Sequence, residues 1–391
     1  MIFIRTIVFF MCLLVLNACS TTKKTYVIES DKNGINLKLP KEGKVATLFL
    51  IGDTGTDKNY NDVQVYLFKQ LKQALKDAGE NSSIVFLGDN IYPAGLPEKE
   101  NAKRGIAEHK LNTQLALLED MPCKSYFIPG NHCWNMMRAG GLQAVQRQEV
   151  YIEQYYQKNK IEFFPNDGCG DPVVKKISDN ITYVFIDTQW WLQNWKTENG
   201  INEGCNIKSR AEFLKALQAI FTKHKAEQIV VLMHHPLFSN GEHGGNFPIA
   251  DHFFPFRIFN SKLWIPLPVI GSILPVTRML GSIKQDIPHK LYQELKDGIL
   301  EMVAKNQQVI FASGHDHSLQ YFVQYQHHFI ISGAGSKVDF AKAGGDARMV
   351  RSAMGYSLLH FYEDETVWLD FYTVDKNKPK GELIYRKEII K

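Results

Sequence analysis

The sequence predicts an α/β fold built as one large domain, and three features of the chain support this. Apolar runs of strand length recur and alternate with stretches of helical periodicity. The clearest helix covers 62–78, where apolar residues return every fourth position from Val63 to Leu75. The tail at 357–385 instead holds strand-like runs separated by polar turns, as in an antiparallel meander. Strands that alternate with helices indicate a layered architecture.

The expected strands follow from continuous apolar stretches, which are typical of strands buried on both faces. Before the tail they lie at 45–51, 84–87, 126–128, 181–186, 229–233, 309–312 and 329–332. Within the tail they lie at 358–362, 367–372 and 382–385.

The amino-acid composition bears on which class of molecule the protein binds. The chain has 391 residues, 45% of them hydrophobic, so it can bury a sizeable core. Its 45 basic and 41 acidic residues leave a formal net charge of +4. Such a near balance argues against an obligate nucleic-acid partner, and none is expected.

An export signal is expected in residues 1–18. Arg5 supplies a basic start, and 7–15 is an apolar stretch too short to span a bilayer. The small residue Ala18 then precedes Cys19, and this arrangement resembles the lipobox of bacterial lipoproteins. It implies cleavage before Cys19, acylation of its thiol and membrane attachment. We therefore expect an exported, membrane-anchored bacterial lipoprotein that faces the periplasm or lies at the outer membrane. The alternative is a secretory signal with an incidental cysteine.

The remaining chain divides into a tether and a folded domain. Residues 19–44 are expected to form the acylated N-terminus and a polar tether with one short strand, and 45–391 the domain. An oxidising compartment would preserve disulfides between the four later cysteines, which allow three pairings. A bridge between Cys169 and Cys205 is favoured because both lie in Gly-rich loops, and Cys133 could then pair with Cys123.

Polar residues of metal-ligand type follow several of the expected strands. The motifs are Gly52-Asp53-Thr54-Gly55, Gly88-Asp89-Asn90-Ile91-Tyr92, Gly130-Asn131-His132, His234 after its strand, and Gly314-His315-Asp316-His317. In α/β sheets, ligands gather at the carboxyl ends of strands, where loops converge on one crevice. Each motif alone is a weak signal, but five at strand ends in one chain indicate a shared metal centre.

The ordered set resembles the calcineurin-like metallophosphoesterase superfamily and, within it, the purple acid phosphatases of the tartrate-resistant type. That family's pattern is Asp-x-Gly, Gly-Asp-x-x-Tyr, Gly-Asn-His, Val-x-x-His and Gly-His-x-His, and every element occurs in order from Asp53 to His317. Tyr92 indicates the subfamily, because most other metallophosphoesterases lack this tyrosine. The resemblance covers residues 45–386. It implies a four-layer sandwich of two mostly mixed β-sheets flanked by α-helices.

The resemblance also implies a two-metal centre whose ligands form two sets. The first set is Asp53, Tyr92 and His317, the second is Asn131, His234 and His315, and Asp89 bridges the two metals. A phenolate oxygen suits Fe³⁺ at the first position. Imidazole and amide ligands suit a divalent ion, Fe, Zn or Mn, at the second.

The implied activity is hydrolysis of phosphate monoesters at acid to neutral pH, with a metal-bound hydroxide attacking phosphorus in line. His132 is assigned to binding the phosphate or protonating the leaving alkoxide, and His243, oriented by Glu242, is the alternative acid. Two other interpretations stay open. One is a phosphodiesterase or nucleotide-processing relative, and the other is a non-catalytic surface lipoprotein that uses the scaffold for binding.

Two features depart from the family pattern. Where the family usually carries an acidic residue after Gly-Asn-His, this chain has Cys133. The inserted segment 246–289 is longer than in compact members and rich in aromatic residues and prolines. Its prolines, such as Pro266, and the charged Arg278 argue against a membrane-spanning helix. We expect an irregular lid packed on the core, and the alternative is an interfacial segment that lies on a bilayer.

Overall fold

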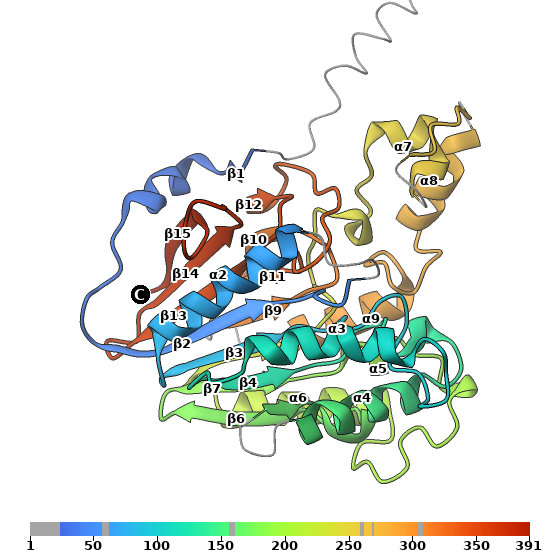
Figure 1. The fold of residues 1–391 in the computed structure, drawn as a ribbon, viewed down its shortest axis with the longest axis horizontal. Coiled ribbons are helices and arrows are strands. Elements are labelled where there is room, and N and C mark those ends of the chain that lie inside the picture. Colours follow the sequence, from blue (N-terminus) through green and yellow to red (C-terminus); the bar gives the residue numbers. More distant parts are fainter. Residues whose placement is uncertain (1–23, 57–61, 156–160, 259–261, 268–269, 304–307) are drawn as a thin grey trace, which may run out of the picture.

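Two β-sheets lie face to face at the centre of the molecule, and helices cover their outer sides (Figure 1). The computed structural model describes residues 24–56, 62–155, 161–258, 262–267, 270–303 and 308–391. The predicted export signal and Cys19 lie outside these described residues. Both sheets are mixed, so the predicted α/β sandwich flanked by helices is confirmed.

One sheet has seven strands in the order β15-β14-β13-β2-β3-β4-β5. Its parallel half contains β2 (Lys44–Ile51), β3 (Ser82–Phe86), β4 (Lys124–Phe127) and β5 (Ile161–Phe163). Its antiparallel half is the predicted C-terminal meander of β13 (Gly355–Tyr362), β14 (Val367–Thr373) and β15 (Glu382–Ile390). The halves join where β13 pairs with β2.

The other sheet has eight strands in the order β1-β12-β10-β11-β9-β8-β7-β6. Its parallel centre contains β7 (Ile181–Phe185), β8 (Gln228–Leu232), β9 (Val309–Ser313) and β11 (His327–Ser332). Antiparallel strands flank this centre on both sides. They are β6 (Val173–Ser178), β10 (Leu319–Gln324), β12 (Ala347–Arg351) and β1 (Tyr26–Val27).

Helices connect the parallel strands and so lie outside the sandwich. The seven-stranded sheet uses α2 (Asp62–Ala78), α3 (Arg104–Leu117) and α4 (Gly141–Tyr155), and the eight-stranded sheet uses α6 (Arg210–Lys223) and α9 (Lys290–Met302). The short helices are α5 (Thr188–Leu192), α7 (Ile249–Phe253) and α8 (Ile273–Met279). One longer 3₁₀ segment is η1 (Glu29–Asn36), and the short ones are η2 (Asn135–Met137), η3 (Asn166–Gly168), η4 (Trp195–Thr197), η5 (Glu242–Gly244), η6 (Pro255–Ile258) and η7 (Ile270–Ser272).

Alternate residues of the central strands face two different cores. In β2, Leu48 and Leu50 belong to the core shared by the two sheets, whereas Phe49 and Ile51 pack in the core that includes Leu67 of α2. This alternation is the period-two pattern of a strand buried on both faces. Because both sheets are held against each other, the carboxyl ends of their parallel strands meet at one edge.

Part of the segment predicted as a tether belongs to the fold. Strand β1 pairs with β12, and η1 packs beside β15. Within η1 the buried carboxylate of Asp31 accepts hydrogen bonds from Arg348 at 2.8 Å and from the Tyr385 hydroxyl at 2.8 Å. Burial alone would raise the pKa of Asp31, but these hydrogen bonds hold it well below its usual value. The polar composition of this segment therefore reflects a buried ion cluster as well as solvation.

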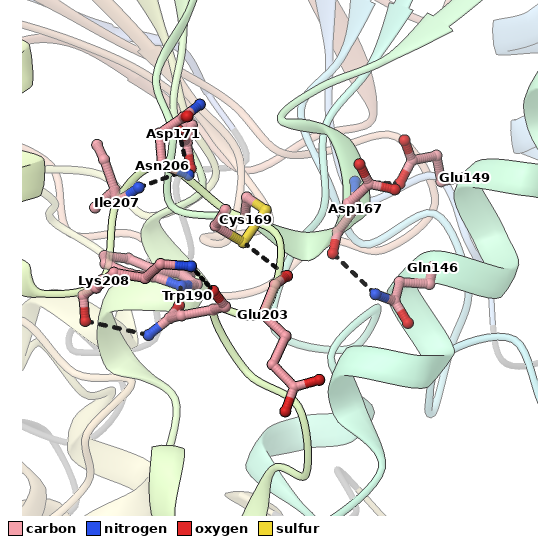
Figure 2. The surroundings of a disulfide bond; sticks show 12 residues. Gln146, Glu149, Asp167, Cys169, Asp171, Trp190, Glu203, Asn206, Ile207 and Lys208 are labelled. Carbon is pink, nitrogen blue, oxygen red and sulfur yellow. Dashed lines mark hydrogen bonds between the residues drawn. A yellow bond between two sulfur atoms is a disulfide. The ribbon is translucent and has the colours of Figure 1, made fainter.

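A disulfide joins Cys169 to Cys205, the pairing favoured from the sequence, with their Cα atoms 5.5 Å apart (Figure 2). Beside it, Asp171 accepts two backbone N–H groups from the loop that follows Cys205. Cys123 and Cys133 are free and buried, so no bridge forms between these two. The disulfide ties the loop after β5 to the loop before α6.

The inserted segment 246–289 is irregular, with only α7, α8 and single turns among its described residues. These two helices lie outside the sandwich at the edge of the molecule (Figure 1). Within the described residues, no helix has both the length and the apolar character needed to cross a membrane.

Candidate metal centre

The predicted ligand residues lie together at the edge where the carboxyl ends of the strands of both sheets meet. They are, in chain order, Asp53 after β2, Asp89 and Tyr92 after β3, Asn131 after β4, His234 after β8, and His315 and His317 after β9. All are buried except His317, whose side chain is 13% exposed. Each sheet therefore supplies part of the centre.

The backbone is strained and closely approached at this edge. Asp53, Asp89 and His315 adopt left-handed φ angles of 59°, 52° and 70°. A non-glycine residue in this region costs about 1–2 kcal/mol, and such strain concentrates at functional sites. A Cβ added at Gly88 would lie only 2.6 Å from Nδ1 of His234, so this glycine is needed for the close approach of the two sheets.

The first set of donors is Asp53, Tyr92 and His317. The Tyr92 hydroxyl donates a hydrogen bond to Oδ1 of Asp53 at 2.8 Å and lies 3.0 Å from Nε2 of His317. Nε2 of His317 lies 3.5 Å from the same Asp53 oxygen. Three donor atoms from three loops thus form a small triangle.

The second set is Asn131, His234 and His315, and it forms a similar triangle. Oδ1 of Asn131 lies 3.0 Å from Nε2 of His234 and 3.1 Å from Nδ1 of His315. The two imidazole nitrogens are 3.3 Å apart. Asp89 lies beside this triangle, with Oδ2 3.5 Å from Nε2 of His234. Asp89 also forms a close group with Asp53 and His234 that could hold a metal ion.

These donors fit metal ions in chemistry and in spacing. Atoms that bind one ion at about 2.1 Å in tetrahedral or octahedral geometry lie about 3.0–3.4 Å from each other. The triangles have edges of 2.8–3.5 Å and 3.0–3.3 Å, and each combines oxygen with nitrogen donors. Carboxylate, phenol, amide and imidazole ligands suit iron, zinc and manganese. Asp53, Tyr92 and His317 could hold one ion, and Asn131, His234 and His315 another, with Asp89 shared.

Hydrogen bonds on the far side of each imidazole direct the other nitrogen into the centre. Nδ1–H of His234 donates to the Leu87 carbonyl at 2.7 Å, and Nε2–H of His315 donates to the Gln285 carbonyl at 3.0 Å. The His317 ring is held in the same way by the Asp339 carboxylate. Such outer contacts select the tautomer in metal sites, and here each leaves one nitrogen facing the donor cluster.

The electrostatics of the centre favour a cation. Burial raises the pKa of Tyr92 well above its usual value, and the carboxylates of Asp53 and Asp89 raise it further. Burial also acts to raise the pKa of Asp89, but His234 and His132 hold it well below its usual range. A phenol buried between two carboxylates can ionise only if positive charge is supplied beside it. A bound metal cation would supply that charge.

His132 lies beside the donor triangles. Its backbone N–H donates to Oδ1 of Asp89 at 2.8 Å, and its Nδ1–H donates to the Pro93 carbonyl at 2.6 Å. Nε2 is therefore directed toward Oδ2 of Asp89, 3.8 Å away. The ring also contacts Tyr92 edge-on, with centroids 4.3 Å apart. This placement borders the predicted metal centre and leaves the side chain 16% exposed.

His243 packs on His315, with ring centroids 3.8 Å apart. Its Nδ1–H donates to Oδ1 of Asp286 at 2.8 Å. The suggestion that Glu242 orients His243 is therefore wrong, because the orienting partner is Asp286. Glu242 instead faces Arg278 at 3.4 Å. Burial lowers the pKa of His243, but the bond to Asp286 outweighs it and the net shift is upward.

Sequence patterns missed several residues around the centre. Gln285 and Asp286 lie near the C-terminal end of the inserted segment 246–289, and no sequence motif marks either of them. His235 was not assigned a role, yet its ring lies 4.3 Å from that of His315 and bonds Thr188 and Gln285. Its neighbour His234 in the motif was the only available signal.

The position after Gly-Asn-His has lost its usual acidic function. Cys133 there is completely buried, and burial raises the pKa of its thiol to about 12. It cannot serve as a carboxylate would in proton transfer. Trp134, the next residue, donates its indole N–H to Asp187 at 2.7 Å and so fixes the loop that carries Asn131.

The sequence itself matches the calcineurin-like phosphoesterases over residues 46–263, more than half of the chain. The chain belongs to the calcineurin-like phosphoesterase family. This calcineurin-like phosphoesterase is therefore a metal-dependent hydrolase of phosphoesters, and the donor clusters at its strand ends agree with a dinuclear metal site. The family match covers Asp53 to His234 and stops before His315 and His317. No curated protein sequence matches the chain.

Solved structures share the fold of this calcineurin-like phosphoesterase. GAP50, described as the anchor in the inner membrane complex of Plasmodium, is 16% identical over 89% of each chain, with a TM-score of 0.52. PhoD is 10% identical over 90% of this chain and 73% of that one, also with a TM-score of 0.52. Purple acid phosphatase PPD1 from yellow lupin seeds is 14% identical over 89% and 54%, with a TM-score of 0.48. The first two likenesses show the fold alone.

Proposed function

We propose that the chain is a phosphomonoesterase of the purple acid phosphatase type, with Fe³⁺ beside Tyr92 and a divalent ion, Fe, Zn or Mn, in the second position. The observation that carries this proposal is the Tyr92 hydroxyl, which lies 2.8 Å from Asp53 and 3.0 Å from His317. A phenol in a donor triangle with carboxylate and imidazole is a ligand set suited to ferric iron. Two such ions, when bound, supply Lewis-acid activation of water and stabilise charge on a phosphoryl group.

The residues of the centre fall into two groups, those that would hold the metal ions and those that would transfer protons. Asp53, Tyr92 and His317 would hold the first ion, Asn131, His234 and His315 would hold the second, and Asp89 would be shared. The outer hydrogen bonds from Asp339, the Leu87 carbonyl and the Gln285 carbonyl keep the three imidazoles in the required tautomer.

Two histidines border the place where a substrate would lie. Nδ1 of His132 is bound to Pro93, so its Nε2 is available to hydrogen-bond the phosphate. Nδ1 of His243 is bound to Asp286, so its Nε2 is the nitrogen that can give a proton to the leaving alkoxide. The buried carboxylate of Asp286 favours the protonated form of His243, and this support makes His243 the better proton donor.

We propose attachment to a membrane through an acylated Cys19 after removal of residues 1–18, which places the enzyme outside the cytoplasm. The support is the apolar stretch 7–15 and the lipobox-like ending. The disulfide between Cys169 and Cys205 agrees with an oxidising compartment. Metabolic labelling with a radioactive fatty acid tests this: label is expected on the wild-type chain and none on Cys19→Ser.

The test of the ferric assignment is visible absorption. Purified, metal-replete protein should absorb in the visible region through charge transfer from tyrosinate to Fe³⁺, and equimolar iron should be found by elemental analysis. Colourless protein with full metal content would remove the ferric assignment. Turnover of a panel of monoesters and diesters then separates the monoesterase from a diesterase.

A scaffold without catalysis is the competing proposal for this fold. GAP50 is described as an anchor, so the fold by itself does not decide activity. The complete donor set supports an enzyme, because a scaffold would not need seven metal-type donors packed within hydrogen-bonding distance. Absence of turnover on all esters in metal-replete protein would favour the scaffold.

A further inference from the structure

The inserted segment carries an unusual concentration of exposed apolar side chains. Of the nineteen large apolar residues that are exposed in the described parts of the chain, nine lie between Ile249 and Leu280. Leu280 is 79% exposed and Trp264 is 53% exposed. Single exposed apolar residues are ordinary, but a contiguous group marks a surface that contacts another phase or molecule.

Most of the exposed apolar residues of the segment lie in two stretches, α8 with Leu280 directly after it and the irregular stretch 263–265. Ile273, Val276 and Met279 are exposed on α8, and Leu263, Trp264 and Ile265 are exposed in the irregular stretch. Both α7 and α8 lie beyond the sandwich at the edge of the molecule (Figure 1). These two helices therefore lie beyond the two sheets, while the buried Arg278 of α8 reaches back to Asp286.

We propose that this surface, which we call the apolar tip and define as Trp264, Ile265, Ile273, Val276, Met279 and Leu280, lies in the interface of an anionic lipid bilayer. Three further observations choose a bilayer as its occupant. The first is composition, since tryptophan with aliphatic neighbours is typical of residues at the membrane–water interface. The guanidinium of Arg257 lies 4.0 Å from the Trp264 ring centroid, which adds a cation at the same place.

The second observation is charge. The segment 246–289 holds four basic and two acidic residues, Asp251 and Asp286. Arg257 lies 3.8 Å from Asp251, and Arg278 pairs with Asp286 at 2.8 Å. By this count the segment carries a formal net charge of +2. Basic residues near an anionic bilayer strengthen binding to it.

The third observation is where the chain leaves the fold. Strand β1 begins at Tyr26, and the proposed anchor Cys19 lies seven positions before Tyr26 in the chain. Seven extended residues span at most about 25 Å. Strand β1 and the helices α7 and α8 lie along the same edge of the molecule (Figure 1). An anchor at Cys19 would hold that edge, and with it the apolar tip, close to the bilayer.

This contact would also place the metal centre near the membrane. Asp286, which binds His243, follows Leu280 by only six positions in the chain. An extended chain of six residues spans about 20 Å. Soluble esters and phosphorylated lipid headgroups would both lie within reach of a centre at that height. The binding surface itself does not depend on which of them is hydrolysed.

The first experiment places an environment-sensitive fluorophore on the tip of the full, Cys19-acylated chain in vesicles of phosphatidylglycerol and phosphatidylethanolamine. The labelled variants are Leu280→Cys and, as matched control, Ile106→Cys on α3, where the wild-type residue is 62% exposed. The free cysteines are buried and label slowly. A blue shift with quenching by lipid-borne nitroxide is expected at position 280 only. Fluorescence typical of water at both positions would overturn the proposal.

The second experiment removes the acyl anchor and measures partition. In full-length Cys19→Ala protein, Leu280→Asp should lower binding to the same vesicles by about tenfold relative to Ile106→Asp, since burying a leucine contributes that much. Both variants keep the N-terminal apolar stretch, so the difference in vesicle binding between them reports the contribution of Leu280. Equal binding would contradict the proposal. A self-association that Leu280→Asp abolishes, without any vesicle effect, would assign the tip to a second copy of the chain instead.

Discussion

Asp286 accepts a hydrogen bond from Nδ1 of His243 at 2.8 Å, although 43 residues separate the two in sequence. The carboxylate is itself held by Arg278 through two contacts of 2.8 Å. The inserted segment therefore supplies the group that orients a histidine of the candidate centre.

Asp286→Ala should lower kcat by about 10–100-fold with little change in KM, because His243 would lose its orientation as proton donor. Steady-state kinetics on a soluble aryl phosphate would measure this, with metal content checked by elemental analysis. Asp286→Asn keeps a hydrogen-bond acceptor and should recover part of the rate. Asp251→Ala, another buried acid of the segment, is the matched control. Unchanged kcat, or loss of metal, would remove the positioning role.

Tyr92→Phe should abolish the visible absorption and lower activity near pH 5 by at least about tenfold, with a smaller loss near pH 8. Without the phenol oxygen, ferric iron loses a ligand, and a divalent replacement acidifies bound water less. Absorption spectra and pH–rate profiles check both parts. Tyr126→Phe, in the core between the sheets, should leave both unchanged. Retained colour in Tyr92→Phe would contradict the ligand assignment.

Lys337→Ala should raise KM for phosphate monoesters about tenfold while kcat changes little. The Lys337 ammonium lies 3.5 Å from the Tyr92 ring centroid, so it places a positive charge at the border of the centre. A dianionic substrate should be attracted there. Lys342→Ala, on the same loop and exposed, is the control. Equal KM values for the two variants would show that Lys337 does not contact substrate.

Replacing Cys169 and Cys205 together by serine should lower the free energy of unfolding by about 2–4 kcal/mol, because the disulfide closes a loop of 36 residues in the unfolded chain. Denaturant titration at neutral pH measures this. The double variant Cys123→Ser, Cys133→Ser is the control, because it replaces two buried free thiols and leaves the disulfide loop closed. Equal stability of wild-type and disulfide-free protein would contradict the prediction.

The Glu149 carboxyl should make the free energy of unfolding of the protein decrease as the pH rises from about 4.5 to 7. Burial raises the pKa of the Glu149 carboxyl to about 7, above its usual 4.5. In this window the unfolded chain releases the proton that the native protein keeps, so the free energy of unfolding decreases with pH. The effect is on the order of 1 kcal/mol after allowing for solvent screening.

Glu149→Gln should remove this decrease, which denaturant titrations at pH 5 and pH 8 would detect. Glu153→Gln, an exposed neighbour on α4, should keep the wild-type slope. If Glu149→Gln and wild-type protein lose the same stability between the two pH values, another group carries the effect.

The strands and the donor constellation were predictable because both depend on short stretches of sequence. Apolar runs such as 229–232 form strands locally, and a polar residue such as His234 directly after one must lie at the sheet edge. The favoured disulfide between Cys169 and Cys205 was also predictable from its loops.

Tertiary contacts were not predictable in this way. From the sequence, the adjacent Glu242 is the expected partner of His243. In the structure, the path of the inserted segment brings Asp286 to the His243 imidazole instead. Asp31 was read as part of a solvated tether, because nothing nearby in sequence indicates its partners Arg348 and Tyr385. Both errors concern polar residues whose partners lie far along the chain.

The division of ligands between the two sheets has a consequence for assembly. Asp53, Asp89 and Tyr92 follow strands of one sheet, whereas His234 and His317 follow strands of the other. If these residues bind metal as proposed, neither sheet alone supplies a complete ligand set, and full metal affinity would arise only after the sheets have docked. Uptake of metal would then be a late step of folding. The bound ions would in turn oppose separation of the layers, so their removal should increase hydrogen exchange in both sheets together.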